Sequence, residues 1–176
     1  CVTAPLNPAY KRDEYAFYMD DLKAKALVVM ADEDGPAVQA ADELGIKILR
    51  LHSSDASPAG VFSLRGSALA SATAAPEAVP AQDDDIALIL HTSGTTSRPK
   101  IVPLLHRNLT ASGHHIASSL ALSGADRCLN VMPLFHIHGL VAAVTASLCA
   151  GASVSCTAGF DALKFFGLMK EVQPTW

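Results

Sequence analysis

The sequence predicts an α/β protein in which layered, parallel-type sheets are flanked by helices. Short apolar runs alternate with amphipathic segments along most of the chain, and short connections join them. This order of strand, helix and strand favours right-handed crossover units in a parallel sheet. Of the 176 residues, 50% are apolar and only 17% are charged, so the chain has enough apolar side chains to bury a core.

The beginning of the chain has the pattern of one crossover unit. Apolar residues three and four positions apart predict a helix at 13–22. The continuous apolar run 26–30 predicts a strand that is buried on both faces. A second helix is expected at 37–44, where Gly45 ends it, and a second strand is expected at 46–51.

Residues 53–85 form a Ser-, Ala- and Pro-rich excursion with little periodicity, which is typical of a surface segment or linker. The excursion ends in Asp83-Asp84-Asp85. We interpret these acids as a solvated turn, because no second acidic cluster lies at metal-ligand spacing. The expected organisation is a first αβ segment at 1–52, the excursion, and a second αβ segment at 86–176.

The alternation resumes in the second αβ segment. The expected strands are 86–90, 127–132 and 152–156, and the expected helices are 108–120, 139–148 and 161–171. The apolar strand at 86–90 is expected to be buried on both faces. The stretch 128–160 lacks charged residues, but Pro133 and His136 interrupt it. Its longest apolar part is shorter than the roughly 20 residues that cross a bilayer, so we expect a buried core helix instead.

Charge and cysteine content exclude several classes of protein. Thirteen Lys and Arg residues against 17 Asp and Glu residues give a net charge of −4, which provides no general attraction to nucleic acids or anionic membranes. An anion site must therefore be local. The four Cys residues show no Cys-x-x-Cys spacing, and we interpret them as reduced thiols. The missing initial Met, and a final Thr175-Trp176 pair that suits the first residues of a strand, indicate a part of a larger enzyme.

The segment from His91 to Lys100 has the side chains needed to bind a polyphosphate. It combines several hydroxyl side chains with a Lys, and Gly94 allows backbone amides to approach a ligand. Its spacing differs from the Gly-x-x-x-x-Gly-Lys nucleotide loop, and it lacks the Gly-x-Gly of a dinucleotide site. On composition alone, an ordinary Ser/Thr-rich turn explains the segment equally well.

Two motifs in order resemble the adenylate-forming enzymes, a superfamily of acyl-CoA synthetases, luciferases and adenylation domains. The motifs are Thr92-Ser93-Gly94-Thr95-Thr96-Ser97-Arg98-Pro99-Lys100, similar to the family's phosphate loop, and Met132-Pro133-Leu134-Phe135-His136-Ile137-His138-Gly139-Leu140. The resemblance covers essentially the whole chain. It implies that residues 1–176 are an incomplete N-terminal AMP-binding domain without the C-terminal domain.

Two positions depart from the usual loop of the superfamily. Ser97 and Ile101 stand where most relatives have Gly, which restricts the backbone at both sites. Ser97, together with Pro103-Leu104-Leu105-His106, is most similar to the variant that the oxalate–CoA ligases carry. Oxalate is therefore the expected acid. The alternatives are a 4-coumarate-type or medium-chain acyl–CoA ligase, and a non-catalytic nucleotide-binding module.

The resemblance also implies roles for individual residues. The residues implied to contact the ATP phosphates are Thr92, Ser93, Gly94, Thr95, Thr96 and Lys100. His136 is implied to lie beside the acyl-adenylate, where its imidazole donates a hydrogen bond to the acid. An alternative interpretation makes His136 and His138 metal ligands, but no third ligand has suitable spacing, so we assign no metal ligand.

The implied reaction needs parts that lie beyond Trp176. The parent enzyme uses a carboxylic acid, ATP, Mg²⁺ and CoA. The segments that help to hold Mg²⁺, grip the ribose and carry a catalytic Lys belong to the remainder of the chain. We therefore expect the isolated 176 residues to have no ligase activity. Relatives occur in the cytosol and in peroxisomes, the two compartments that we expect.

Overall fold

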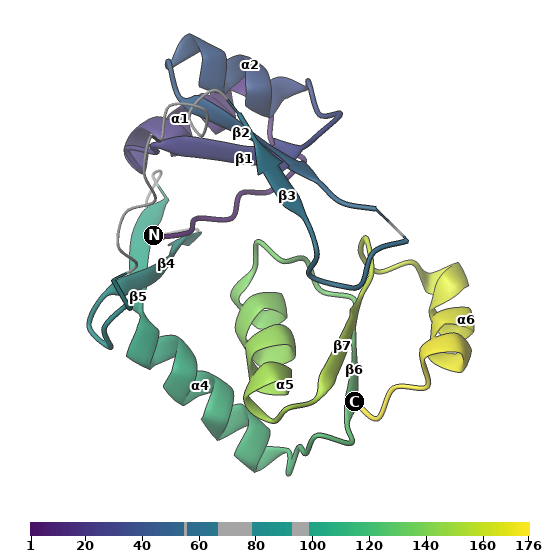
Figure 1. The fold of residues 1–176 in the computed structure, drawn as a ribbon. Coiled ribbons are helices and arrows are strands. Elements are labelled where there is room, and N and C mark those ends of the chain that lie inside the picture. The colour runs from purple at the N-terminus through teal and green to yellow at the C-terminus, as the bar shows by residue number, and fades with distance from the viewer. Residues whose placement is uncertain (55, 67–78, 93–98) are drawn as a thin grey trace. The chain divides into compact units, whose positions relative to one another are not determined.

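The helices and strands of the chain fall into two units. The computed structural model describes residues 1–54, 56–66, 79–92 and 99–176. The first unit is Leu6–Val79, and the second unit consists of Cys1–Pro5 and Pro80–Trp176. Each unit contains a parallel pair of strands with helices packed on it (Figure 1). This arrangement confirms the predicted α/β class.

The first unit is built on a crossover of strand, helix and strand, as the sequence predicts. Its elements are α1 (Arg12–Asp21), β1 (Ala26–Met30), α2 (Pro36–Glu43), β2 (Lys47–His52) and β3 (Ser63–Arg65). β1 and β2 are parallel, with Leu27 opposite Ile48, and β2 and β3 are antiparallel. β3 lies within the predicted excursion 53–85. Its three residues are exposed, so backbone pairing with β2 holds a strand that has no apolar pattern.

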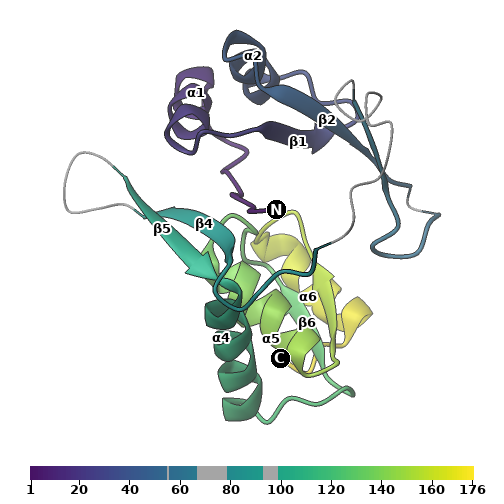
Figure 2. The same ribbon diagram turned by 60° about the vertical axis from the view of Figure 1, so that its left-hand side comes forward.

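Small side chains on α2 allow it to pack closely on α1. Ala40 and Ala41 are completely buried, and Met19 of α1 is 2% exposed in the same cluster. Leu27 and Ile48 of the sheet pack against this cluster. The two helices therefore cover one face of the β1–β2 pair, as Figure 2 also shows.

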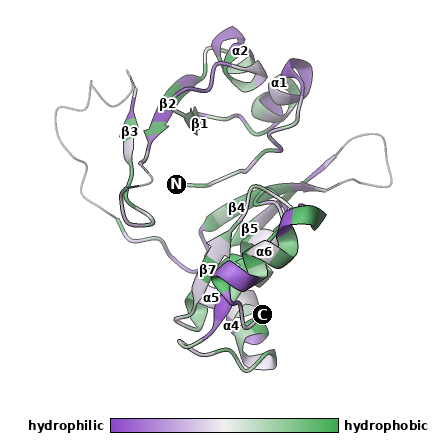
Figure 3. Ribbon diagram, turned by 90° about the vertical axis from the view of Figure 1, so that its right-hand side faces the viewer, coloured by the Kyte–Doolittle hydropathy of each residue, from purple (hydrophilic) through white to green (hydrophobic). Residues whose placement is uncertain are grey.

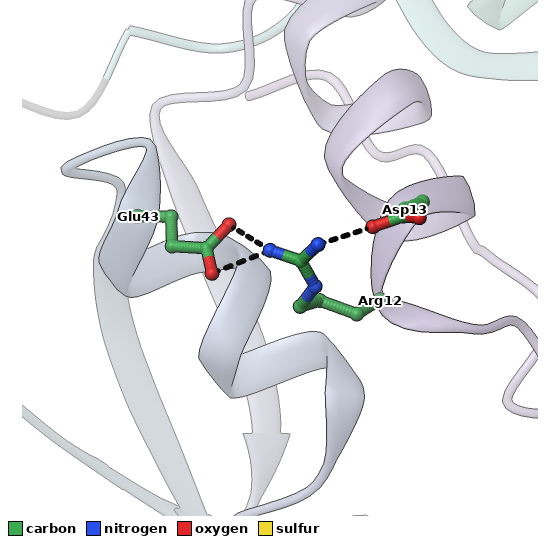
Figure 4. Close-up of polar contacts among 3 residues, drawn as sticks. All are labelled: Arg12, Asp13 and Glu43. Carbon is green, nitrogen blue, oxygen red and sulfur yellow. Dashed lines mark hydrogen bonds and ion pairs between the residues drawn. The ribbon is translucent and has the colours of Figure 1, made fainter.

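Arg12 joins the two helices through ion pairs (Figure 4). Its Nη1 donates to both carboxylate oxygens of Glu43 at 2.6 Å, and its Nη2 donates to Asp13 Oδ1 at 2.5 Å. The hydrogen bond to Glu43, reinforced by the Asp13 charge, raises the pKa of the Arg12 guanidinium above its ordinary value. Because these side chains are solvent-exposed, the pairs contribute little to stability and mainly orient the ends of the helices.

The prediction that the strand at 26–30 is buried on both faces is wrong for β1. Val28 and Met30 are each 52% exposed, whereas Leu27 packs against the core of the unit. Alternate residues of a strand point to opposite faces, and both helices of the unit pack on the same face. The apolar run is therefore half covered within this unit.

The second unit contains the residues that the sequence analysis singled out for chemistry. Its elements are β4 (Ile86–Thr92), β5 (Lys100–Leu105), α4 (His106–Ser119), β6 (Arg127–Asn130), η1 (His138–Thr145), α5 (Ala146–Cys149), β7 (Ser153–Cys156) and α6 (Ala162–Val172). β6 and β7 are parallel, and α5 and α6 lie on opposite sides of this pair (Figure 1). α6 is coloured mostly as hydrophobic in Figure 3, yet its Leu163 and Phe166 are 96% and 77% exposed.

The strand expected at 86–90 is present as β4, but it is not buried on both faces. Leu88 and Leu90 are buried, whereas Ile86 is exposed. Such alternation is typical of an antiparallel sheet with one covered face. β4 is indeed antiparallel to its neighbour β5.

β5 is a strand that the sequence analysis did not predict. It contains Pro103, which stands opposite Ile89 of β4. Proline lacks an N–H donor and is tolerated at the edge of a sheet. Thr3 occupies the other side of β4, where its N–H donates to Ala87 O at 3.1 Å, so β5 is the edge strand among the described residues.

The uncharged stretch 128–160 folds into several short elements rather than one long helix. In the part of the chain that the structure describes, no helix has the length and apolar character needed to cross a membrane. The helix predicted at 139–148 is present, but the first part, η1, is a π-helix that continues into α5. Within this segment the Thr145 hydroxyl donates to Leu140 O at 2.9 Å.

The last residues of the chain are bound to β6. Thr175 N donates to Arg127 O at 2.8 Å, and Leu129 N donates to Trp176 O at 3.1 Å. The Thr175 hydroxyl donates to Asp126 Oδ1 at 2.8 Å, and this bond lowers the pKa of the Asp126 carboxyl below its ordinary value. The final segment and β6 thus support each other.

Replacing each of two glycines by Ala tests the backbone of the fold, and we expect opposite effects on the free energy of unfolding. Gly45 follows α2 with φ +66, a conformation that strains any other residue, and we expect Gly45→Ala to destabilise the chain by about 1 kcal/mol. Gly167 lies inside α6 with open space around it, and we expect Gly167→Ala to stabilise by about 1 kcal/mol. Urea unfolding followed by circular dichroism measures both changes. A neutral or stabilising Gly45→Ala contradicts the helix ending described here.

Candidate functional site

The β4–β5 hairpin carries the two ends of the predicted phosphate loop. Thr92 is the last residue of β4 and Lys100 the first residue of β5, and the two stand opposite each other in the antiparallel register. Both residues are exposed. The other four predicted contact residues, Ser93, Gly94, Thr95 and Thr96, lie outside the described residues.

The acidic turn that precedes β4 supports the base of this hairpin. Asp85 O accepts a hydrogen bond from His106 N at 3.0 Å, and Asp83 O accepts one from Arg107 N at 3.1 Å. The Arg107 guanidinium also forms an ion pair with Asp84. These contacts fix the start of α4 beside the start of β4. The three acids lie in an exposed turn, as interpreted from the sequence, and Arg107 takes part in its contacts.

His136 lies in the turn that leads from β6 to η1. Its backbone N–H donates to Pro133 O at 3.2 Å, and its carbonyl accepts from Leu140 N at 3.1 Å. Its imidazole Nδ1 accepts a hydrogen bond from the backbone N–H of His138 at 3.4 Å. His136 is exposed, so its ring has a fixed contact on one side and remains accessible to a ligand.

Two residues around this turn were not recognised in the sequence analysis. Asn130, the last residue of β6, is only 3% exposed, and its side chain forms hydrogen bonds with the backbone of Met132. Gly139 is buried at the start of η1, where an added Cβ would lie 2.6 Å from Pro133 O. A polar residue ending a buried strand, and a Gly just after the His-x-His pair, were the available signals.

The described residues provide no third ligand for a metal site at His136 and His138, the alternative interpretation of this pair. Among residues 1–54, 56–66, 79–92 and 99–176, no group of three or more His, Cys, Asp or Glu side chains converges. Cys128, on the buried face of β6, is also unsuited to ligation. Burial raises the pKa of its thiol, which keeps the sulfur protonated.

The class of protein follows from comparison of the whole chain with known families. Residues 1–176 match the family of AMP-binding enzymes. The chain therefore belongs to this family, which confirms the resemblance to adenylate-forming enzymes.

Relatives of the chain include several CoA ligases. The chain is 42% identical over 175 residues to the oxalate–CoA ligase of Arabidopsis thaliana, a match that covers 98% of this chain and 34% of the relative. It is 35% identical over 195 residues to the oxalate–CoA ligase of Saccharomyces cerevisiae, covering 99% of this chain and 36% of that protein. It is also 34% identical over 180 residues to a crotonobetaine/carnitine–CoA ligase of Escherichia coli, covering 99% and 34%. The chain thus spans about a third of the length of these relatives.

A solved structure supports the same fold. ATP-bound MatB from Rhodopseudomonas palustris superposes with a TM-score of 0.72 at 30% sequence identity, over 97% of this chain and 33% of that chain. The arrangement of small sheets and flanking helices is therefore that of part of the N-terminal domain of an adenylate-forming enzyme.

Proposed function

We propose that the chain is the nucleotide-binding part of a carboxylic acid–CoA ligase of the cytosol or peroxisome. The observation that carries the proposal is the pairing of Thr92 with Lys100 at the loop end of the β4–β5 hairpin, which we call its mouth. The connection between them, 93–99, is rich in hydroxyl side chains. The residues that we assign to the ATP phosphates are Thr92, Ser93, Gly94, Thr95, Thr96 and Lys100. Membership of the AMP-binding family supports this assignment.

The proposed reaction exchanges bonds first at phosphorus and then at carbon. A carboxylate oxygen of the acid attacks the α-phosphorus of ATP, the bond to the bridging oxygen of the β-phosphate breaks, and pyrophosphate leaves with the electron pair. The CoA sulfur then attacks the acyl carbon after its proton passes to solvent, and AMP leaves. The acid itself is the first nucleophile, so the protein needs no side-chain nucleophile.

The residues of this chain act by positioning and by electrostatics. Negative charge develops on phosphoryl oxygens during the first step, and donors already in place stabilise it. The Lys100 ammonium and the hydroxyl and backbone donors of the hairpin connection supply this stabilisation. His136 donates a hydrogen bond to the acid and orients it for attack.

Mg²⁺ usually binds one or two carboxylates together with water and the phosphates of the nucleotide. The resemblance to adenylate-forming enzymes implies that the protein segment that helps to hold Mg²⁺ lies beyond Trp176. We therefore assign its protein ligands to the rest of the full-length enzyme. No step assigned to this chain uses the metal.

Oxalate is the acid that we assign to the full-length enzyme. The similarity to two oxalate–CoA ligases supports this choice. Oxalate has a second carboxylate that does not react, and a hydrogen-bond donor such as His136 is suited to hold it. A 4-coumarate-type or medium-chain acid is the alternative. That the Escherichia coli relative is named for crotonobetaine and carnitine shows that relatives of this chain differ in the acid they are named for.

Removal of the Lys100 charge tests the phosphate assignment. We expect Lys100→Ala in the full-length enzyme to lower kcat/KM for ATP by a factor of about 100 to 1,000, because a preorganised donor to developing charge is lost. Lys100→Arg, which retains the charge, loses less. Lys170→Ala removes an exposed Lys in the last turn of α6 and is the matched control. ATP–pyrophosphate exchange measures all three variants, and equal effects of Lys100→Ala and Lys170→Ala contradict the assignment.

Substrate preference tests the identity of the acid. We expect the full-length enzyme to release pyrophosphate fastest with oxalate, and more slowly with 4-coumarate and octanoate, when compared by kcat/KM. The isolated 176 residues are expected to release none, because the relatives are about three times as long. Equal or greater activity with 4-coumarate or octanoate rejects oxalate while leaving the ligase reaction intact.

A further inference from the structure

The imidazole of His136 has a backbone contact that favours one tautomer. A neutral imidazole has one nitrogen that donates and one that accepts a hydrogen bond. Nδ1 of His136 accepts from the backbone N–H of His138 at 3.4 Å. This contact favours the neutral tautomer that carries its proton on Nε2, which is the nitrogen farther from the backbone. An Nε2–H group is a donor that can reach a carboxylate.

Asn130 fixes the backbone from which the His136 turn starts. Its Oδ1 accepts from Met132 N at 3.1 Å, and its Nδ2 donates to Met132 O at 3.0 Å. Nδ2 also contacts Cys156 Sγ at 3.8 Å on the neighbouring strand β7. A buried amide that bonds to both backbone groups of one residue leaves that residue little freedom, because either bond left unpaired would be costly.

Gly139 closes the turn from the other side. A Cβ at this position would lie 2.6 Å from Pro133 O and 3.1 Å from Met132 O. Both carbonyls belong to the segment that Asn130 and the His136 backbone hold, since Pro133 O accepts from His136 N. The start of η1 can therefore approach this segment only with Gly at 139. His138, whose N–H donates to the His136 ring, directly precedes Gly139.

We propose that Asn130 is a positioning residue that, through Met132 and Gly139, presents His136 to the acid as an Nε2–H donor. The inference rests on the proposed ligase function only for the identity of the acceptor, a carboxylate of the substrate. The tautomer and the backbone clamp are properties of the protein without substrate. They can therefore be tested independently of activity.

The wild-type enzyme provides the first test. In full-length enzyme labelled with ¹⁵N-histidine, the His136 signals are assigned by their loss in His136→Ala. We expect proton-coupled ¹⁵N spectra at pH 8.5 to show the proton of His136 on Nε2. A predominant Nδ1–H form overturns the proposal without reference to catalysis.

Asn130→Asp provides the second test, because it keeps the acceptor for Met132 N but replaces the donor to Met132 O. We expect a mixture of His136 tautomers and a KM for the acid that rises roughly tenfold, as for the loss of one well-placed hydrogen bond, with little change in KM for ATP. Asn108→Ala is the matched control. It removes a side-chain amide whose Oδ1 accepts a hydrogen bond from Leu105 N at 2.9 Å. This contact lies at the start of α4, outside the His136 turn.

The outcomes separate this inference from the proposed function. Suppose that Asn130→Asp is as well folded as Asn108→Ala but leaves the His136 tautomer and the KM values for the acid and for ATP unchanged. This result overturns the positioning role. If Asn130→Asp fails to fold, Gly139→Ala takes its place with the same expectations, because the added methyl pushes η1 away. An Nε2–H tautomer in an enzyme whose His136→Ala variant uses the acid normally supports the clamp and refutes the role of His136 in catalysis.

Discussion

The antiparallel pairing of β4 with β5 is the constraint on which the candidate site depends. It brings Thr92 and Lys100, eight residues apart in sequence, to opposite positions at the mouth of one hairpin. The pairing is anchored away from the mouth, where Leu88 and Leu90 are buried and the acidic turn before β4 holds the start of α4. The base of the hairpin is thus held by burial and by backbone hydrogen bonds, whereas Thr92 and Lys100 at its mouth are exposed.

The main elements of the fold could be predicted from the sequence because their signals are local. The strand at 26–30 and the helices beside it follow from apolar periodicity, and the predicted positions agree with β1, α1 and α2 to within a residue or two. β3 and β5 could not be predicted in this way. β3 has only exposed residues, and Pro103 weakens the pattern of β5, so partner strands rather than their own sequences determine them.

The candidate site could be predicted only in part from the sequence. Thr92, Lys100 and His136 were found through motifs, whereas Asn130 and Gly139 act through contacts with backbone carbonyls that no periodicity encodes. The helix at 139–148 was predicted, but its π-helical start was not. The type of helix depends on which carbonyl accepts the hydrogen bond from each backbone N–H, and apolar periodicity does not encode this choice. The burial of β1 and β4 was overestimated, because an apolar run does not indicate whether one or both faces of the strand are covered by other elements.

The central claim is that the connection between β4 and β5 binds the phosphates of ATP. Hydrogen exchange of the full-length enzyme, followed by mass spectrometry with and without ATP, tests it most directly because it reports on backbone amides at the mouth of the hairpin. The account predicts slowed exchange in peptides that cover 91–101 and no slowing in peptides that cover β1. Binding of ATP that leaves exchange at 91–101 unchanged would contradict it.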